Sequence, residues 1–237
     1  MPTVLITGAN RGIGLEFARQ YAANGWRVIA CCRSPLDADD LNALAQEHPA
    51  LIVESLDVRD HSAIDALAGK YAEQPIDVLL NNAGIIGPTP IAEHVERQHF
   101  GSMDYALWQE VIETNTFAPL KMTETFADHV AASEQKKIIN ISSTVASIGE
   151  MSTSGLAYAS SKSALNRVMT TVAGELRDRR ITVALFCPGY VKTRMDAWGI
   201  APVEIVDSVT ALRGLIAGLT LDDTGNFTRY DGTPISW

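Results

Sequence analysis

Cysteines, basic residues and long apolar runs are all scarce in this sequence. Only 3 cysteines occur among 237 residues, which is too few for a disulfide framework, and their spacing is not that of metal ligands. Each lies near the end of an apolar segment, so we expect Cys31, Cys32 and Cys187 to be small buried side chains. The formal net charge of -9 argues against the basic surface that binding to nucleic acid or to an anionic membrane would need.

Apolar segments long enough to span a bilayer, roughly 18 to 20 residues, are missing as well. An expected strand starts almost at Met1 and leaves no room for a signal peptide, so we expect a cytoplasmic protein. The sequence also lacks linkers, repeats and low-complexity segments. With 46% hydrophobic and 20% charged residues, 1–237 is expected to form one globular domain.

Short apolar segments alternate with longer segments of helical pattern. The apolar ones are Val4–Ile6, Arg27–Cys31, Leu51–Val53, Val78–Leu80, Ile138–Ile141 and Thr182–Phe186, and the helical ones are 12–24, 37–46, 61–73, 104–132, 157–178 and 203–219. Continuous apolar strands separated by helices are typical of a parallel sheet that is buried on both faces. The sequence therefore predicts an α/β fold, a doubly wound parallel sheet that binds ligands at the carboxyl ends of its strands.

A glycine-rich turn, Thr7-Gly-Ala-Asn-Arg-Gly-Ile-Gly14, follows the first expected strand and opens a helix. Glycines allow a tight turn and a close backbone approach, and the free N–H groups at a helix start favour a phosphate. The spacing differs from the commoner Gly-x-Gly-x-x-Gly pattern. An ordinary strand-to-helix turn is the alternative interpretation.

The second expected strand ends in Cys31-Cys-Arg33 and carries no acidic residue at its tip. A carboxylate there would accept hydrogen bonds from an adenosine ribose and would repel a 2′-phosphate. Arg33 can instead offer a bidentate fork to that phosphate, and Arg11 can add a second positive charge. The sequence thus favours NADP(H) over NAD(H), with solvated surface arginines as the alternative.

Tyr158 and Lys162 are four residues apart in a segment of helical pattern. Residues at this spacing share one helix face, so the ammonium group lies beside the phenol and favours the phenolate. A phenol that exchanges its proton near neutral pH is a plausible acid or base for a carbonyl/alcohol pair. Tyr190 has no such company and is interpreted as a packing or surface residue.

Further motifs follow in order: Asp57-Val58, Asn81-Asn-Ala-Gly84, Asn115, Ser143 and Pro188-Gly-Tyr-Val-Lys-Thr193. With the glycine turn and the Tyr158/Lys162 pair, they resemble the short-chain dehydrogenase/reductase family over essentially residues 3 to 237. The glycine turn, the Cys-Arg strand end and the tail 225–237 are similar to its C-factor and carbonyl-reductase-like branch. The resemblance implies a Rossmann-type sheet of about seven strands.

The resemblance also implies a set of site residues. The expected catalytic residues are Asn115, Ser143, Tyr158 and Lys162. The expected cofactor-binding residues are Gly8, Asn10, Arg11, Gly12, Ile13, Gly14, Arg33, Asp57, Val58, Asn82, Ala83, Gly84, Tyr158, Lys162, Pro188, Gly189, Val191 and Thr193. Ser143 is chosen over its neighbour Ser142 by motif alignment, and a short substrate lid is expected at about 194–206.

On this interpretation the chain is an NADP(H)-dependent oxidoreductase that acts on a small carbonyl or alcohol compound, with Tyr158 as acid or base. We expect no metal ion. We expect the chain to form a homodimer or a homotetramer. A regulatory or signalling NADP(H)-binding protein of the C-factor kind is the alternative. An extended-type epimerase or dehydratase would need a longer segment after Thr193.

Overall fold

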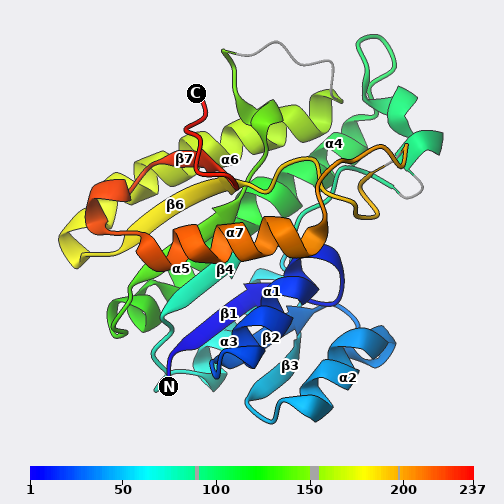
Figure 1. The fold of residues 1–237 in the computed structure, drawn as a ribbon. Helices are drawn as coiled ribbons and strands as arrows, with labels where there is room; N and C mark the ends of the chain where they lie inside the picture. Colours follow the sequence, from blue (N-terminus) through cyan, green and yellow to red (C-terminus); the bar gives the residue numbers. More distant parts are fainter. Residues whose placement is uncertain (89–90, 150–154, 197) are drawn as a thin grey trace.

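A single parallel sheet forms the centre of the molecule (Figure 1). The computed structural model describes residues 1–88, 91–149, 155–196 and 198–237. In these residues the sheet has seven strands in the order β3-β2-β1-β4-β5-β6-β7. The strands are β1 Thr3–Thr7, β2 Arg27–Cys32, β3 Leu51–Ser55, β4 Val78–Asn81, β5 Lys137–Ile141, β6 Thr182–Cys187 and β7 Phe227–Arg229.

Helices cover both faces of this sheet. They are α1 Gly12–Ala23, α2 Asp39–Glu47, α3 His61–Lys70, α4 Tyr105–Ile112, α5 Ala118–Ala131, α6 Leu156–Glu175 and α7 Ile205–Gly218. Helices α1, α2 and α7 lie on one face of the sheet and α3, α5 and α6 on the other (Figure 1), and each group packs against the sheet in its own core cluster. The predicted doubly wound Rossmann-type fold is confirmed.

The alternation of side chains along each strand divides the core between these two faces. Leu5 of β1 packs in the cluster with α3, α5 and α6, whereas its neighbours Val4 and Ile6 pack in the cluster with α1, α2 and α7. All three are fully buried. A strand with both faces buried needs apolar residues at every position, which explains the unbroken apolar runs in the sequence.

The helix predicted over 104–132 is divided by a wider turn. Helices α4 and α5 are joined by a π-helical turn, Glu113–Phe117, in which the Ala118 N–H donates to the Glu113 carbonyl. Pro119 causes this departure, because proline has no N–H to donate to the carbonyl of Asn115 four residues earlier. The turn places Asn115 at the carboxyl edge of the sheet, where its side chain is fully buried.

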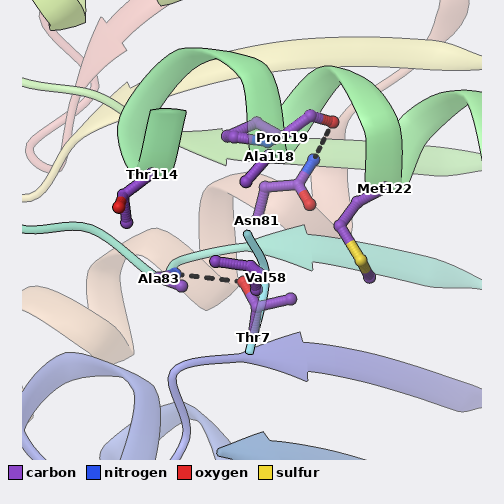
Figure 2. Close-up of a pocket in the computed structure, with 8 residues that line it drawn as sticks. All are labelled: Thr7, Val58, Asn81, Ala83, Thr114, Ala118, Pro119 and Met122. Carbon is purple, nitrogen blue, oxygen red and sulfur yellow. Dashed lines mark hydrogen bonds between the residues drawn. The ribbon is translucent and has the colours of Figure 1, made fainter. Parts of the chain in front are cut away.

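The crevice between β1 and β4 is the point where the strand order reverses. Thr7, at the end of β1, accepts hydrogen bonds at Oγ1 from the N–H groups of Asn82 and Ala83, both at 3.0 Å. Figure 2 shows Thr7 and Ala83 facing Thr114 of the π-helical turn and Ala118 at the start of α5, while Asn81 Nδ2 donates to the Pro119 carbonyl. These contacts fix the two strand ends and the π-helical turn as one base for the site above them.

Candidate active site

The glycine turn after β1 is packed against the turn after β4. Gly8 has a φ of +67°, and a Cβ there would lie 2.9 Å from the Ala83 Cα. A Cβ on Gly14 would lie 2.2 Å from the Gly8 carbonyl oxygen. Asn82 Nδ2 donates to the carbonyls of Thr7 at 2.9 Å and Gly8 at 3.2 Å. Larger residues at Gly8 or Gly14 would therefore push the turn off its support.

Gly12 has more open surroundings than these two glycines. Its φ is +55°, and a Cβ there would approach only Thr193, 3.7 Å from Cγ2. This contact brings the predicted Pro188–Thr193 loop to the start of α1. Arg11 precedes Gly12, and Arg33 follows β2, and both side chains are exposed.

Ser143 and Tyr158 come together at the carboxyl end of β5. Ser143 leaves the strand in an extended conformation, and its Oγ accepts from the Val145 N–H at 3.4 Å. The same side chain lies close enough to the Tyr158 hydroxyl, near the start of α6, to lower the pKa of that phenol. Ser142 points to the opposite side of the strand, where its hydroxyl donates to Asn166 Oδ1 at 2.6 Å in the core. Strand alternation thus separates the two serines, and the structure places Ser143 at Tyr158.

Burial dominates the acidity of the phenol. Tyr158 is half-buried, and the burial of its hydroxyl, followed by the nearby Cys187, raises the pKa of Tyr158 to about 12, whereas the nearby Ser143 side chain acts the other way. At neutral pH the phenol is therefore protonated, the form that can donate a proton.

Lys162 lies on the same side of α6 as Tyr158. Its Nζ is 5.9 Å from the centroid of the Tyr158 ring and donates to the Ile141 carbonyl at 2.8 Å. Burial lowers the pKa of Lys162 to about 8. The spacing prediction is correct in placing the ammonium by the ring, but the predicted shift toward phenolate is outweighed by burial of the hydroxyl.

Asn115 and Gly84 connect this pair to the turn after β4. Asn115 Nδ2 donates to the Ile85 carbonyl at 2.7 Å and to Ser161 Oγ at 3.0 Å. A Cβ on Gly84 would lie 3.2 Å from Asn115 Oδ1 and 3.5 Å from Lys162 Nζ. The predicted residues Gly84, Asn115 and Lys162 therefore converge, and a side chain at position 84 would crowd the Asn115 amide oxygen.

The loop after β6 is held at both ends. The Pro188 carbonyl accepts a hydrogen bond from Ser208 Oγ at 2.7 Å. Gly189 has a φ of +86°, and a Cβ there would lie 2.8 Å from the Tyr230 ring. Val191 is buried and forms an isolated parallel bridge with Val203. The positive φ and the nearby Tyr230 ring leave no room for a side chain at position 189, which explains the glycine that follows Pro188.

The expected lid over 194–206 has a side-chain anchor that the sequence did not reveal. The hydroxyl of Tyr190 donates to Asp196 Oδ1 at 2.6 Å, so the tyrosine is more than a packing or surface residue. Trp198 and Ile200 beyond it are 64% and 70% exposed. Ala197 lies outside the described residues, and the last two positions of the predicted lid belong to α7.

Four remaining cofactor candidates contribute differently. Asp57, which follows β3, is half-buried and pairs with Arg59, whereas Val58 is 7% exposed and packs in the core. Asn10 lies in the glycine turn, and Ile13 packs partly against the core under α1. Of these four side chains, that of Val58 is the only one buried in the core.

Cys187 and Gln98 are two residues near the site that sequence reasoning did not assign to it. Cys187 Sγ accepts from the N–H groups of Thr144 at 3.3 Å and Gly189 at 3.4 Å, joining the loops after β5 and β6. Gln98 is 3% exposed and donates to the Ile86 carbonyl at 2.7 Å. The position of Cys187 directly before Pro188 and Gly189 could have indicated from the sequence that it lies near the site. No motif in the sequence indicated this for Gln98.

No group of three or more His, Cys, Asp or Glu side chains in residues 1–88, 91–149, 155–196 and 198–237 is arranged to hold a metal ion. None of the helices formed by these residues is long and apolar enough to cross a membrane.

Comparisons with known proteins agree with the geometry. A 1-hydroxy-2-glutathionyl-2-methyl-3-butene dehydrogenase from Rhodococcus sp. is 30% identical over 100% of both chains. An NADPH-bound carbonyl reductase from chicken fatty liver is 30% identical, with a TM-score of 0.89 over 100% of this chain and 99% of that one. A carbonyl reductase from Pseudomonas aeruginosa in complex with NADP is 27% identical, with a TM-score of 0.85 over 100% of both. The family model for short chain dehydrogenases matches residues 2–199, and the chain belongs to this family of oxidoreductases.

Proposed function

We propose that this oxidoreductase uses NADP(H) to interconvert a small carbonyl compound and its alcohol, with Tyr158 as the acid or base. The observation that carries the proposal is the position of the Lys162 Nζ, which lies 5.9 Å from the centroid of the Tyr158 ring and is held by the Ile141 carbonyl at the end of β5, with Ser143 close enough to act on the phenol. A donor, a polar neighbour and a positive charge are thereby gathered where a carbonyl oxygen can be received. The carbonyl reductases of similar fold support the same reaction class.

The residues at the carboxyl edge fit a dinucleotide that carries a 2′-phosphate. Gly12 leaves open space at the start of α1, where N–H groups can bind the pyrophosphate. Arg33 is exposed at the end of β2, beside Cys32, and no acid at that strand tip would repel a 2′-phosphate. Gly84 keeps the approach to Asn115 and Lys162 free of a side chain.

Reduction of a carbonyl group needs a hydride and a proton, and a residue of this chain supplies the proton. Bound NADPH supplies the hydride. Tyr158, protonated at neutral pH, donates its proton to the oxygen of the carbonyl substrate, and Ser143 donates a hydrogen bond to the same oxygen as negative charge develops there. The Lys162 ammonium stabilises the tyrosinate that remains, because opposite charges favour the ionised form.

Cofactor titration tests the proposal. Wild-type protein should bind NADPH more tightly than NADH, and Arg33→Ala should weaken NADPH binding about 10- to 100-fold with little effect on NADH, since a charge-assisted contact of roughly 1.5–3 kcal/mol is lost. Arg167→Ala, an exposed arginine on α6, is the control with the same change in charge. A panel of aldehydes and ketones should then reveal NADPH oxidation. A wild-type preference for NADH, or equal losses for both cofactors, contradicts the cofactor assignment.

The lid over 194–206 and the substrate are parts of the same proposal. Met195, Trp198 and Ile200 are exposed apolar side chains of this segment. They favour an apolar aldehyde or ketone, which would cover them on binding. The expected homodimer or homotetramer stays a prediction that gel filtration can test.

A further inference from the structure

Three arginines gather at the start of α1 without a carboxylate among them. Arg11, Arg33 and Arg194 are all exposed, and none forms an ion pair with a carboxylate in the described residues. Although Arg11 is exposed as a whole, burial of part of its side chain, followed by the charges of Arg194 and Arg33, holds the pKa of Arg11 below its usual value. Arg194 and Arg33 are thus each close enough to Arg11 for their charges to act on it, in a chain of net charge -9.

The position of Arg194 follows from its neighbour Thr193. Thr193 Cγ2 is 3.7 Å from where a Cβ on Gly12 would lie, so the loop after β6 crosses the start of α1 at this point. The Lys192 N–H donates to the Val203 carbonyl at 3.0 Å, and the Asp196 N–H donates to the Thr193 carbonyl at 2.9 Å. Backbone bonds therefore fix the chain on both sides of Arg194.

The nearest acidic residue along this loop is already engaged. Asp196 accepts the Tyr190 hydroxyl at 2.6 Å and the N–H of Ile200 at 3.2 Å through Oδ1, and the N–H of Ala201 at 3.0 Å through Oδ2. Three of the roughly four positions at which this carboxylate can accept hydrogen bonds are therefore taken within the loop. Asp196 forms no ion pair with Arg194 in the described residues, so the charge of Arg194 is available to an anion from outside the chain.

We propose that Arg194 is a phosphate-binding residue of the cofactor site. Arg194 binds the pyrophosphate of the dinucleotide near Gly12, and Arg33 binds the 2′-phosphate. The inference rests on the proposed function, and it assigns a residue that the family motifs did not include. Arg33 follows the last residue of β2, whereas Arg194 follows Thr193, the residue beside Gly12, and on this difference in position we assign the two arginines to different phosphates. Arg194 therefore sets affinity for any dinucleotide, and Arg33 sets the choice between NADPH and NADH.

Binding of four probes to the intact protein separates these roles. The probes are NADPH, NADH, ADP-ribose, which keeps the pyrophosphate but has no nicotinamide, and 2′-AMP, which has no pyrophosphate. Arg194→Gln should weaken the binding of NADPH, NADH and ADP-ribose by the same factor, about tenfold for the loss of an exposed charge-assisted contact. The affinity for 2′-AMP should stay unchanged. Arg194→Lys should restore part of the loss, because the positive charge returns without the fork.

Arg167→Gln is the control for the lost charge, and it should bind all four probes as the wild type does. If Arg194→Gln matched this control for every probe, Arg194 would not bind a phosphate. A loss confined to NADPH and 2′-AMP would also overturn the assignment, because it would place Arg194 at the 2′-phosphate. If the wild-type protein bound none of the probes, the proposed function would fail and this inference with it, a result distinct from the other two.

Discussion

Asn115 holds the backbone of Ile85 from both sides. Its Nδ2 donates to the Ile85 carbonyl at 2.7 Å, and its Oδ1 accepts from the Ile85 N–H at 2.9 Å. One buried side chain thus replaces the backbone partner that Ile85 would have had in a sheet. The residue expected to be catalytic is also a structural clamp on the turn after β4.

Asn115→Ala should lower the free energy of unfolding by about 2–4 kcal/mol, because it removes three hydrogen bonds and leaves buried polar groups unpaired. Urea unfolding followed by circular dichroism measures the change. Asn226→Ala, at an exposed position before β7 whose side chain forms no hydrogen bond in the described residues, should change stability by less than about 0.5 kcal/mol. A loss at Asn115 as small as that at Asn226 would show that the clamp contributes little.

The adjacent serines should separate activity from stability. Ser143→Ala should reduce kcat about 10²- to 10³-fold, as for the loss of one donor to a developing oxyanion, with near-wild-type stability. Ser142→Ala should instead lower stability by about 1–3 kcal/mol, since Asn166 loses a buried partner, and should keep most of the activity. Carbonyl reduction and thermal unfolding, measured on both variants, decide the matter. The reverse pattern would reassign the catalytic serine to Ser142.

Tyr158→Phe keeps the ring and removes the proton donor. Carbonyl reduction should fall about 10²- to 10⁴-fold, while NADPH affinity changes little. Tyr105→Phe, an exposed tyrosine on α4, is the matched control and should retain full turnover. Near-wild-type turnover by Tyr158→Phe would remove the phenol from the mechanism. A wild-type protein that binds NADPH without reducing any carbonyl compound would favour the regulatory alternative instead.

Lys162→Met should make the protein more stable at neutral pH. Burial lowers the folded-state pKa of Lys162 from 10.5 to about 8, so between these values the unfolded chain binds more protons than the folded one. Wild-type stability therefore gains from this group as pH rises from 8 toward 10.5, and below pH 8 the buried ammonium destabilises the fold fully. Removing the charge should add about 1–3 kcal/mol at pH 7.

Urea unfolding of this variant and the wild type at pH 7 and 9.5 measures the effect, and the difference should shrink at the higher pH. Lys192→Met, at an exposed lysine that pairs with Glu204, should show no such shrinkage. A difference that stayed constant would mean that the Lys162 pKa is not lowered. The variant should also lose turnover, because the tyrosinate loses its neighbouring charge.

The sequence predicts this fold well because every strand from β1 to β6 contains a short, mainly apolar run, interrupted in β5 by Asn140. The seventh strand has only three residues, Phe227–Arg229, at the edge of the sheet, where burial is incomplete and the apolar signal is weak. The helix over 104–132 was predicted as one piece because its apolar pattern continues through the π-helical turn. Pro119 was the signal for the turn, since it removes one helix hydrogen bond without ending the helix.

Site placement was predictable where spacing alone decides it, as for Tyr158 and Lys162 on one helix. The acidity of the Tyr158 hydroxyl could not be predicted from the sequence, because its pKa depends on burial by β5, β6 and the loops after them. Tyr190 and Asp196 show the same limit. Their hydrogen bond depends on how the loop after β6 folds back, which no short motif encodes.

The clamp at Thr7 has a consequence for the order of events during synthesis. Its bond with the Ala83 N–H joins residues 76 positions apart, so the chain must close a long loop before the bond can form. Contacts of such separation are slow to form. A nascent chain that has emerged only as far as α3 therefore has a glycine turn with no support under it. Dinucleotide capture has to wait until β4 is inserted beside β1.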